Sequence, residues 1–140
     1  MDSLISFFTI VLLLILVLFP IIIVLKLNQI KNKKIYIISL ILSLLVAFGL
    51  VFLIAWWGDF SDKILLSNYG YDFEAMNNIE RYLNVSKENF EKVKELERSM
   101  GGIGWPLKAI LSYFVFYLPY FLVVHLFYYF MKKIIRGKSM

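Results

Sequence analysis

The sequence predicts an all-α membrane protein with three transmembrane helices. Three uncharged apolar runs, at residues 4–25, 35–57 and 109–131, hold 22, 23 and 23 residues. At about 1.5 Å per residue each run spans roughly 33 to 35 Å as a helix, slightly more than a hydrocarbon core of about 30 Å. The strands of membrane β-barrels are about half as long and alternate in polarity, so these uniformly apolar runs predict helices instead. With 61% hydrophobic residues, the 140-residue chain is expected to form a single membrane domain.

The distribution of charge predicts the orientation of these spans. Most of the basic residues beside the spans lie in the loop 26–34 and the tail 132–140, and by the positive-inside rule these belong in the cytoplasm. The 47-residue segment 58–104 has nine carboxylates and six basic residues, a net charge of −3. We therefore expect an extracytoplasmic helical insertion at 58–104, the N-terminus outside and a basic cytoplasmic tail at 132–140.

The first span shows one irregularity of consequence, Pro20, which predicts a kink near its cytoplasmic end. The chain begins Met-Asp-Ser, without the basic start of a signal peptide, so the run is interpreted as a permanent span. The short loop 26–34 then predicts an antiparallel helical hairpin. The chain is rich in Ile, Phe, Lys, Asn and Tyr, which indicates an AT-rich coding sequence. A bacterial source, and hence the bacterial inner membrane, is the default expectation, and an organelle genome is the second.

The second span carries small residues at every fourth position: Ser39, Ser43 and Ala47. They share one helix face, and small residues at this spacing let helix backbones approach closely. A packing seam within the chain is favoured over one with another subunit. Trp56 and Trp57 close the span as lipid anchors, where aromatic belts lie.

The segment 58–104 contains two helix candidates. The first has an amphipathic pattern at Ala75, Met76, Ile79, Tyr82 and Leu83, with Asp72 as a possible cap. The second begins at Ser86 as N-cap and ends at Gly101, and its apolar stripe is formed by Phe90, Val93, Leu96 and Met100. The apolar sides of two such short helices are expected to rest on each other and on the membrane surface or a partner, which makes the stripe a candidate binding surface.

Three glycines between residues 101 and 104 predict a break before the third span, and Pro106 suits the first turn of its helix. Trp105 is expected to lie at the interface, as an anchor or as part of a surface that recognises a partner.

The third span carries tyrosines on one face. Tyr113, Tyr117, Tyr120 and Tyr128 fall within an arc of about 80°. Their hydroxyls are expected either to bond to neighbouring helices, the favoured interpretation, or to face a partner, and Tyr113, Tyr117 and Tyr120 are the candidate partner-binding residues. Pro119 predicts a kink that frees the carbonyl of Val115.

The sequence contains no pattern typical of an enzyme. It has one histidine and no cysteine, so common zinc sites are excluded, and no catalytic residue, metal or cofactor is expected. His125 lies within the third span without other ionisable groups for a proton relay, which favours a packed neutral imidazole. In the tail, Lys132, Lys133, Arg136 and Lys138 are expected to anchor the protein on lipid headgroups, and the tail is too short to bind nucleic acid.

These features predict a small non-enzymatic membrane protein that binds another membrane protein or itself. It would act as an immunity protein against a membrane-acting toxin or as an accessory subunit of a membrane complex. In size and layout the chain resembles several bacteriocin and contact-toxin immunity proteins, a resemblance of architecture without a shared motif. The alternatives are a phage-type holin or other pore-former, and a subunit of a transporter or respiratory complex.

Overall fold

The protein is helical throughout its regular structure in the computed structural model, which describes the backbone of residues 1–137 and the side chains of residues 1–134. The helices in chain order are α1 Asp2–Leu27, α2 Lys33–Asn68, α3 Asn78–Arg81, α4 Phe90–Met100, α5 Trp105–Ser112, the π-helix η1 Tyr113–Tyr117 and α6 Leu118–Gly137. Three helical stretches, Asp2–Leu27, Lys33–Asn68 and Trp105–Ile134, are long and apolar enough to cross a membrane. The all-α membrane fold class is confirmed.

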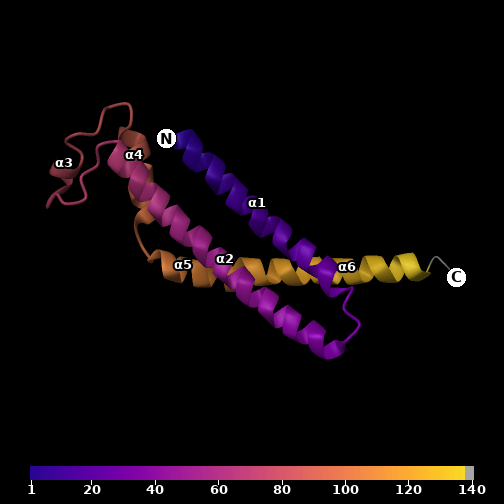
Figure 1. Cartoon of the computed structure of the whole chain (residues 1–140). Coiled ribbons are helices and arrows are strands. Elements are labelled where there is room, and N and C mark those ends of the chain that lie inside the picture. Colours follow the sequence, from indigo (N-terminus) through magenta and orange to yellow (C-terminus); the bar gives the residue numbers. More distant parts are fainter. Residues whose placement is uncertain (138–140) are drawn as a thin grey trace.

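Helices α1 and α2 lie side by side as an antiparallel hairpin, and the continuous helix formed by α5, η1 and α6 crosses them (Figure 1). The N-terminus and the segment between α2 and α5 lie at one end of the molecule, and the end of α6 lies at the other (Figure 1). This arrangement places the segment 58–104 on the same side as Asp2, as three membrane crossings require.

The hairpin turn is held by two asparagine side chains. The Nδ2 of Asn28 donates to the carbonyl of Val24 at 2.9 Å, at the end of α1. Asn32 is the N-cap of α2, and its Oδ1 accepts from the backbone N–H of Lys34 at 2.9 Å. The Asn32 side chain thus satisfies backbone N–H groups that the start of α2 leaves without partners, whereas the Val24 carbonyl also accepts from the backbone N–H of Asn28.

Helix α2 does not end at Trp57, where the apolar run ends, but continues to Asn68. Residues 58–68, expected as the start of a separate insertion, are therefore an extension of the second long helix. Hydropathy falls after Trp57, but no proline interrupts the helix, and the Asp59 carboxylate pairs with Lys63 one turn later at 2.7 Å.

The extension ends at Gly70 in a Schellman motif, the hydrogen-bonding pattern that commonly terminates helices. The N–H of Tyr71 donates to the carbonyl of Leu66 at 3.0 Å, and the N–H of Gly70 donates to that of Ser67 at 3.1 Å. Gly70 has a φ of +87°, and a Cβ at this position would lie 2.4 Å from the carbonyl oxygen of Asn84. Only glycine suits both the backbone angle and this close approach.

The third membrane helix begins at Trp105, with Pro106 in its first turn as predicted, and contains one turn of π-helix. In that turn the N–H of Leu118 donates to the carbonyl of Tyr113, five residues back. The next residue is Pro119, which has no N–H to donate. The irregularity that the sequence predicts at Pro119 thus takes the form of a π-turn, a common adjustment within membrane helices.

The transmembrane core lies between the small-residue face of α2 and the tyrosine face of the third helix. Its buried members are Ala47, Val51, Tyr113, Tyr117 and Phe121. Ser43 is also buried, and Ser39 is half-buried. The small-residue face thus packs within this chain, which is the favoured interpretation from the sequence, and it meets large aromatic residues rather than other small ones.

Candidate functional site

The tyrosine hydroxyls of the third span bond to backbone carbonyls of the other two spans. Tyr113 donates to the carbonyl of Leu44 at 3.0 Å, Tyr117 to that of Leu16 at 3.4 Å, and Tyr120 to that of Val17 at 2.9 Å. Tyr113 and Tyr117 are only 6% and 5% exposed, whereas Tyr120 is half-buried. Each of the three candidate partner-binding tyrosines therefore already has an acceptor within the chain.

His125 lies at the end of the membrane domain opposite the outer segment. Its Nε2 is 3.3 Å from the hydroxyl of Tyr36 on α2. Its Nδ1 is buried and has no hydrogen-bond partner among the described residues. The side chain links α6 to α2 as part of the packing.

The aromatic anchors predicted at the outer interface pack against other side chains of the chain. Trp56 stacks on Phe60 with ring centroids 5.2 Å apart. The Nε1 of Trp57 donates to the hydroxyl of Thr9 on α1 at 3.1 Å. Trp105 meets Phe52 edge-on at 5.5 Å. At the other end Lys132 and Lys133 continue along α6, whereas the side chain of Arg136 and all of Lys138 lie outside the described residues.

The outer segment has a hydrophobic core of its own, built on the α2 extension. The buried residues are Leu66, Tyr71 and Val93, surrounded by Tyr69, Tyr82, Val85, Leu96 and Met100. Of the predicted apolar stripe on α4, Val93 is fully buried, Leu96 and Met100 are partly buried, and Phe90 is 41% exposed. The stripe thus fastens α4 to the extension rather than facing outward.

Glu97 is the polar centre of this core. It accepts hydrogen bonds from the hydroxyls of Tyr71, at 2.8 Å, and of Tyr82. The hydrogen bond from Tyr82 is the largest influence that lowers the pKa of Glu97 below its ordinary value. Burial, followed by the hydrogen bond to Glu97, raises the pKa of Tyr82 to about 12. At neutral pH the site therefore holds a carboxylate between two neutral phenols.

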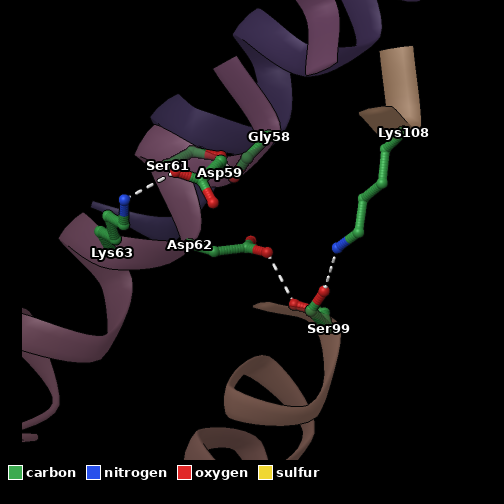
Figure 2. A network of polar contacts seen from close by, with 7 residues as sticks. All are labelled: Gly58, Asp59, Ser61, Asp62, Lys63, Ser99 and Lys108. Atoms are coloured by element: carbon green, nitrogen blue, oxygen red, sulfur yellow. Dashed lines mark hydrogen bonds and ion pairs between the residues drawn. The ribbon is translucent and has the colours of Figure 1, made fainter. Parts of the chain in front are cut away.

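A second polar network fixes the outer segment to the membrane helices (Figure 2). The Asp62 carboxylate, on the α2 extension, accepts from the hydroxyl of Ser99 on α4 at 2.7 Å. The Nζ of Lys108, on α5, donates to the backbone carbonyl of the same serine at 2.7 Å. Asp62 and Lys108 reach Ser99 from two separate helices (Figure 2). This network joins α2, α4 and α5.

The N-terminus is also tied to the outer segment. The hydroxyl of Tyr69, at the end of α2, donates to the carboxylate of Asp2, and the Nζ of Lys92 lies 5.9 Å from the centre of the Tyr69 ring. A polar groove of about 450 Å³ lies beside this contact, lined by residues that include Asp2, Ser6, Asp62 and Glu95.

The outer loop, defined as residues 72–84, is where the structure departs most from the expected pattern. Only Asn78–Arg81 is helical, and the cap is Asn77 rather than Asp72. The prediction of a longer amphipathic helix capped by Asp72 is therefore wrong. The helix ends at Tyr82, its C-cap residue, and the hydroxyl of Tyr82 bonds to Glu97. The apolar side chains of the loop face outward: Phe73 is 44% exposed, Met76 98%, Ile79 82% and Leu83 71%.

Several backbone and side-chain hydrogen bonds within the outer loop fix its conformation. The N–H of Asp72 donates to the carbonyl of Arg81 at 3.1 Å, and the Nε of Arg81 donates to the carbonyl of Ala75 at 3.2 Å. The Oδ1 of Asn77 accepts from the N–H of Glu80 at 2.8 Å, and its Nδ2 donates to the carboxylate of Glu80 at 2.8 Å. The loop is therefore a bonded structure that exposes apolar side chains.

The described residues contain no group of three or more histidine, cysteine or carboxylate side chains arranged to hold a metal ion. Comparison with protein-family models, with curated proteins and with solved structures finds no match to this chain. The function is therefore inferred from the geometry of the outer segment itself.

Proposed function

We propose that the protein is a small non-enzymatic membrane protein whose outer loop binds another membrane protein. One observation carries this proposal: Phe73, Met76, Ile79 and Leu83 are exposed on a loop that is bonded in place. Large exposed apolar side chains rimmed by polar residues are typical of interaction sites. The two versions of the proposal are an immunity protein against a membrane-acting toxin and an accessory subunit of a membrane complex.

The position of the outer loop supports a partner in water rather than lipid. The loop follows α2, which extends eleven residues beyond Trp57, or about 16 Å along the helix axis. In Figure 1, α3 lies at the end of the molecule farthest from the end of α6. The exposed side chains are thus held away from the tryptophans that mark the interface.

The use of the charged groups supports a binding role over catalysis. Asp59 is paired with Lys63, Asp62 is bonded to Ser99, and Glu97 is bonded to two tyrosines. A catalytic carboxylate must instead be free to reach a substrate. Asp62 and Glu97 instead hold separate segments of the chain together, and Asp59 pairs within α2.

We further propose that the outer loop faces the extracytoplasmic side of a bacterial plasma membrane. The basic residues of the loop 26–34 and of the end of α6 support this orientation, because such residues favour the cytoplasmic side.

A photo-crosslinking amino acid at Met76, in the full chain in its native membrane, tests the proposal. Met76 is almost fully exposed, so the substitution disturbs no packing. We expect a discrete protein adduct from this position and none from Glu91, an exposed position on α4 that serves as the matched control. A folded protein that gives no protein adduct from Met76 or Ile79 would contradict the proposal.

The immunity version and the pore-forming alternative make opposite predictions in cells. Expression of the immunity protein should leave membrane potential unchanged and protect cells from a toxin encoded beside it. Depolarisation and lysis on expression would instead support a pore-former.

A further inference from the structure

We infer that the partner surface that the outer loop contacts is apolar at its centre and carries lysine or arginine side chains around it. This inference rests on the proposed function and adds the chemistry of the partner. It follows from the charges that accompany the exposed apolar residues.

The apolar side chains of the outer loop alternate with carboxylates. Asp72 and Glu74 flank Phe73, and Glu80 follows Ile79, and all three carboxylate residues are exposed. The only basic residue of the loop, Arg81, is half-buried and its Nε bonds to the carbonyl of Ala75 within the loop. Three acidic residues and one basic residue give the loop a net charge of −2. The loop therefore combines exposed apolar groups with a net negative charge.

This charge pattern selects among the possible occupants of the surface. Anionic lipid headgroups attract basic segments, so they would repel an acidic loop. A second copy of the same loop would bring like charges together, which opposes association. A protein surface with basic residues around an apolar centre satisfies both the carboxylates and the apolar side chains, and opposite charge also speeds its encounter with the loop.

Two of the carboxylates can be neutralised without disturbing the loop. No described residue forms an ion pair with the Glu74 carboxylate or donates a hydrogen bond to it. The Glu80 carboxylate accepts from Asn77, and a glutamine in its place keeps an oxygen acceptor there. The double variant Glu74→Gln/Glu80→Gln therefore removes charge and keeps the cap. Glu88→Gln/Glu91→Gln, at exposed positions before and within α4, is the matched control.

The probes are two labelled amphipathic helical peptides, one made of leucine and lysine and one with glutamate in place of lysine. The full chain, with a photo-crosslinker at Met76, is placed in phosphatidylcholine nanodiscs, and peptide adducts are quantified at low and high salt. We expect at least tenfold more adduct with the lysine peptide. The yield should fall several-fold in high salt and in Glu74→Gln/Glu80→Gln, but remain unchanged in the control variant. Matching thermal melting curves would show that each variant is folded.

Three results would overturn the inference. These are equal adduct yields from both peptides, no effect of Glu74→Gln/Glu80→Gln, and adducts from Met76 that consist mainly of lipid or of a second copy of the chain. The proposed function and this inference can be contradicted independently of each other. If Met76 captures a protein in native membranes but the peptides show no charge preference, the function stands and the basic partner surface does not.

Discussion

The hydroxyl of Tyr117 lies 3.4 Å from the carbonyl oxygen of Leu16, which is the backbone acceptor that Pro20 leaves without its usual donor. In a regular helix this carbonyl would accept from the N–H four residues later, and proline has none. Lipid offers no water in compensation, so a group on a neighbouring helix must supply the donor. A proline in one span is thus matched by a tyrosine in another.

Removing this hydroxyl should destabilise the membrane domain more than removing that of Tyr120. The acceptor of Tyr120, the carbonyl of Val17, can still bond to the N–H of Ile21 within its own helix. We expect Tyr117→Phe to lower the free energy of unfolding by about 1–2 kcal/mol, and Tyr120→Phe to lower it by about 0.6 kcal/mol or less. Unfolding in mixed micelles measures both, and equal losses would contradict the matching of Tyr117 to Pro20.

Alanine at Gly70 should disrupt the outer segment. The positive φ strains the backbone, and the added Cβ would lie 2.4 Å from the carbonyl oxygen of Asn84. Together they should lower the free energy of unfolding by about 2 kcal/mol or more. Gly102→Ala is the control, because Gly102 has a φ of +89° but no atom within 4 Å of the added Cβ. Limited proteolysis of 69–89 should therefore accelerate strongly in the Gly70 variant and weakly in the Gly102 variant.

The outer segment should lose stability at both ends of the pH range. The folded state lowers the pKa of Glu97, so this carboxylate stabilises above its ordinary pKa of 4.5, and the contribution is lost as pH falls through the lowered value. The pKa of Tyr82 is raised from 10.0 to about 12, so its contribution is complete below pH 10 and is lost between these values. Hydrogen exchange of α4 measures both transitions.

Two substitutions separate these transitions. Glu97→Gln should remove the acid-side loss, and Tyr82→Phe should remove the part of the alkaline loss that belongs to Tyr82. An acid transition that persists unchanged in Glu97→Gln would assign it to another carboxylate.

Polar substitution of the exposed apolar residues should separate binding from folding. Met76→Ser and Ile79→Ser are expected to change stability by no more than about 0.5 kcal/mol, because both side chains are exposed, and to abolish protein adducts from a crosslinker at Leu83. Val93→Ala, at the fully buried centre of the outer core, should instead cost about 2 kcal/mol. Thermal unfolding and adduct yield are measured side by side. Retained adducts in both serine variants would argue against the outer loop as the binding surface.

Single cysteines can establish the orientation, because the chain has none of its own. Ser67 on the α2 extension and Lys31 in the hairpin loop are both exposed. We expect a membrane-impermeant maleimide to label Ser67→Cys in intact cells and Lys31→Cys only after lysis. The reverse pattern would overturn the orientation proposed from charge.

The sequence predicts several of the features that depend on local chemistry, but the predicted N-cap Ser86 is wrong, because α4 begins at Phe90 after Asn89. The three spans follow from the length of their apolar runs, the end of α4 at Gly101 from a glycine stop, and the start of α5 from Pro106. The end of α2 was also predictable in principle. Glycine at position 70 followed by apolar Tyr71 is a typical helix stop, but the fall in hydropathy after Trp57 predicts an earlier boundary.

The remaining features depend on contacts between residues far apart in the chain. The inward turn of Tyr82 requires Glu97, fifteen residues later. Without that contact, the spacing of Met76, Ile79 and Leu83 is indistinguishable from the buried face of a helix. The acceptors of the membrane tyrosines lie in other spans, so the sequence indicates that the hydroxyls need partners without identifying them.

Helix α2 connects the two halves of the molecule as one unbroken rod from Lys33 to Asn68. Its outer end carries the core around Leu66, and its inner part presents Ala47 to the tyrosine face. A rod without a hinge transmits torque, so a partner that twists the outer segment would also turn Ala47 against its aromatic neighbours. The transmembrane packing would then oppose a force applied to the outer segment, or would change in response to it.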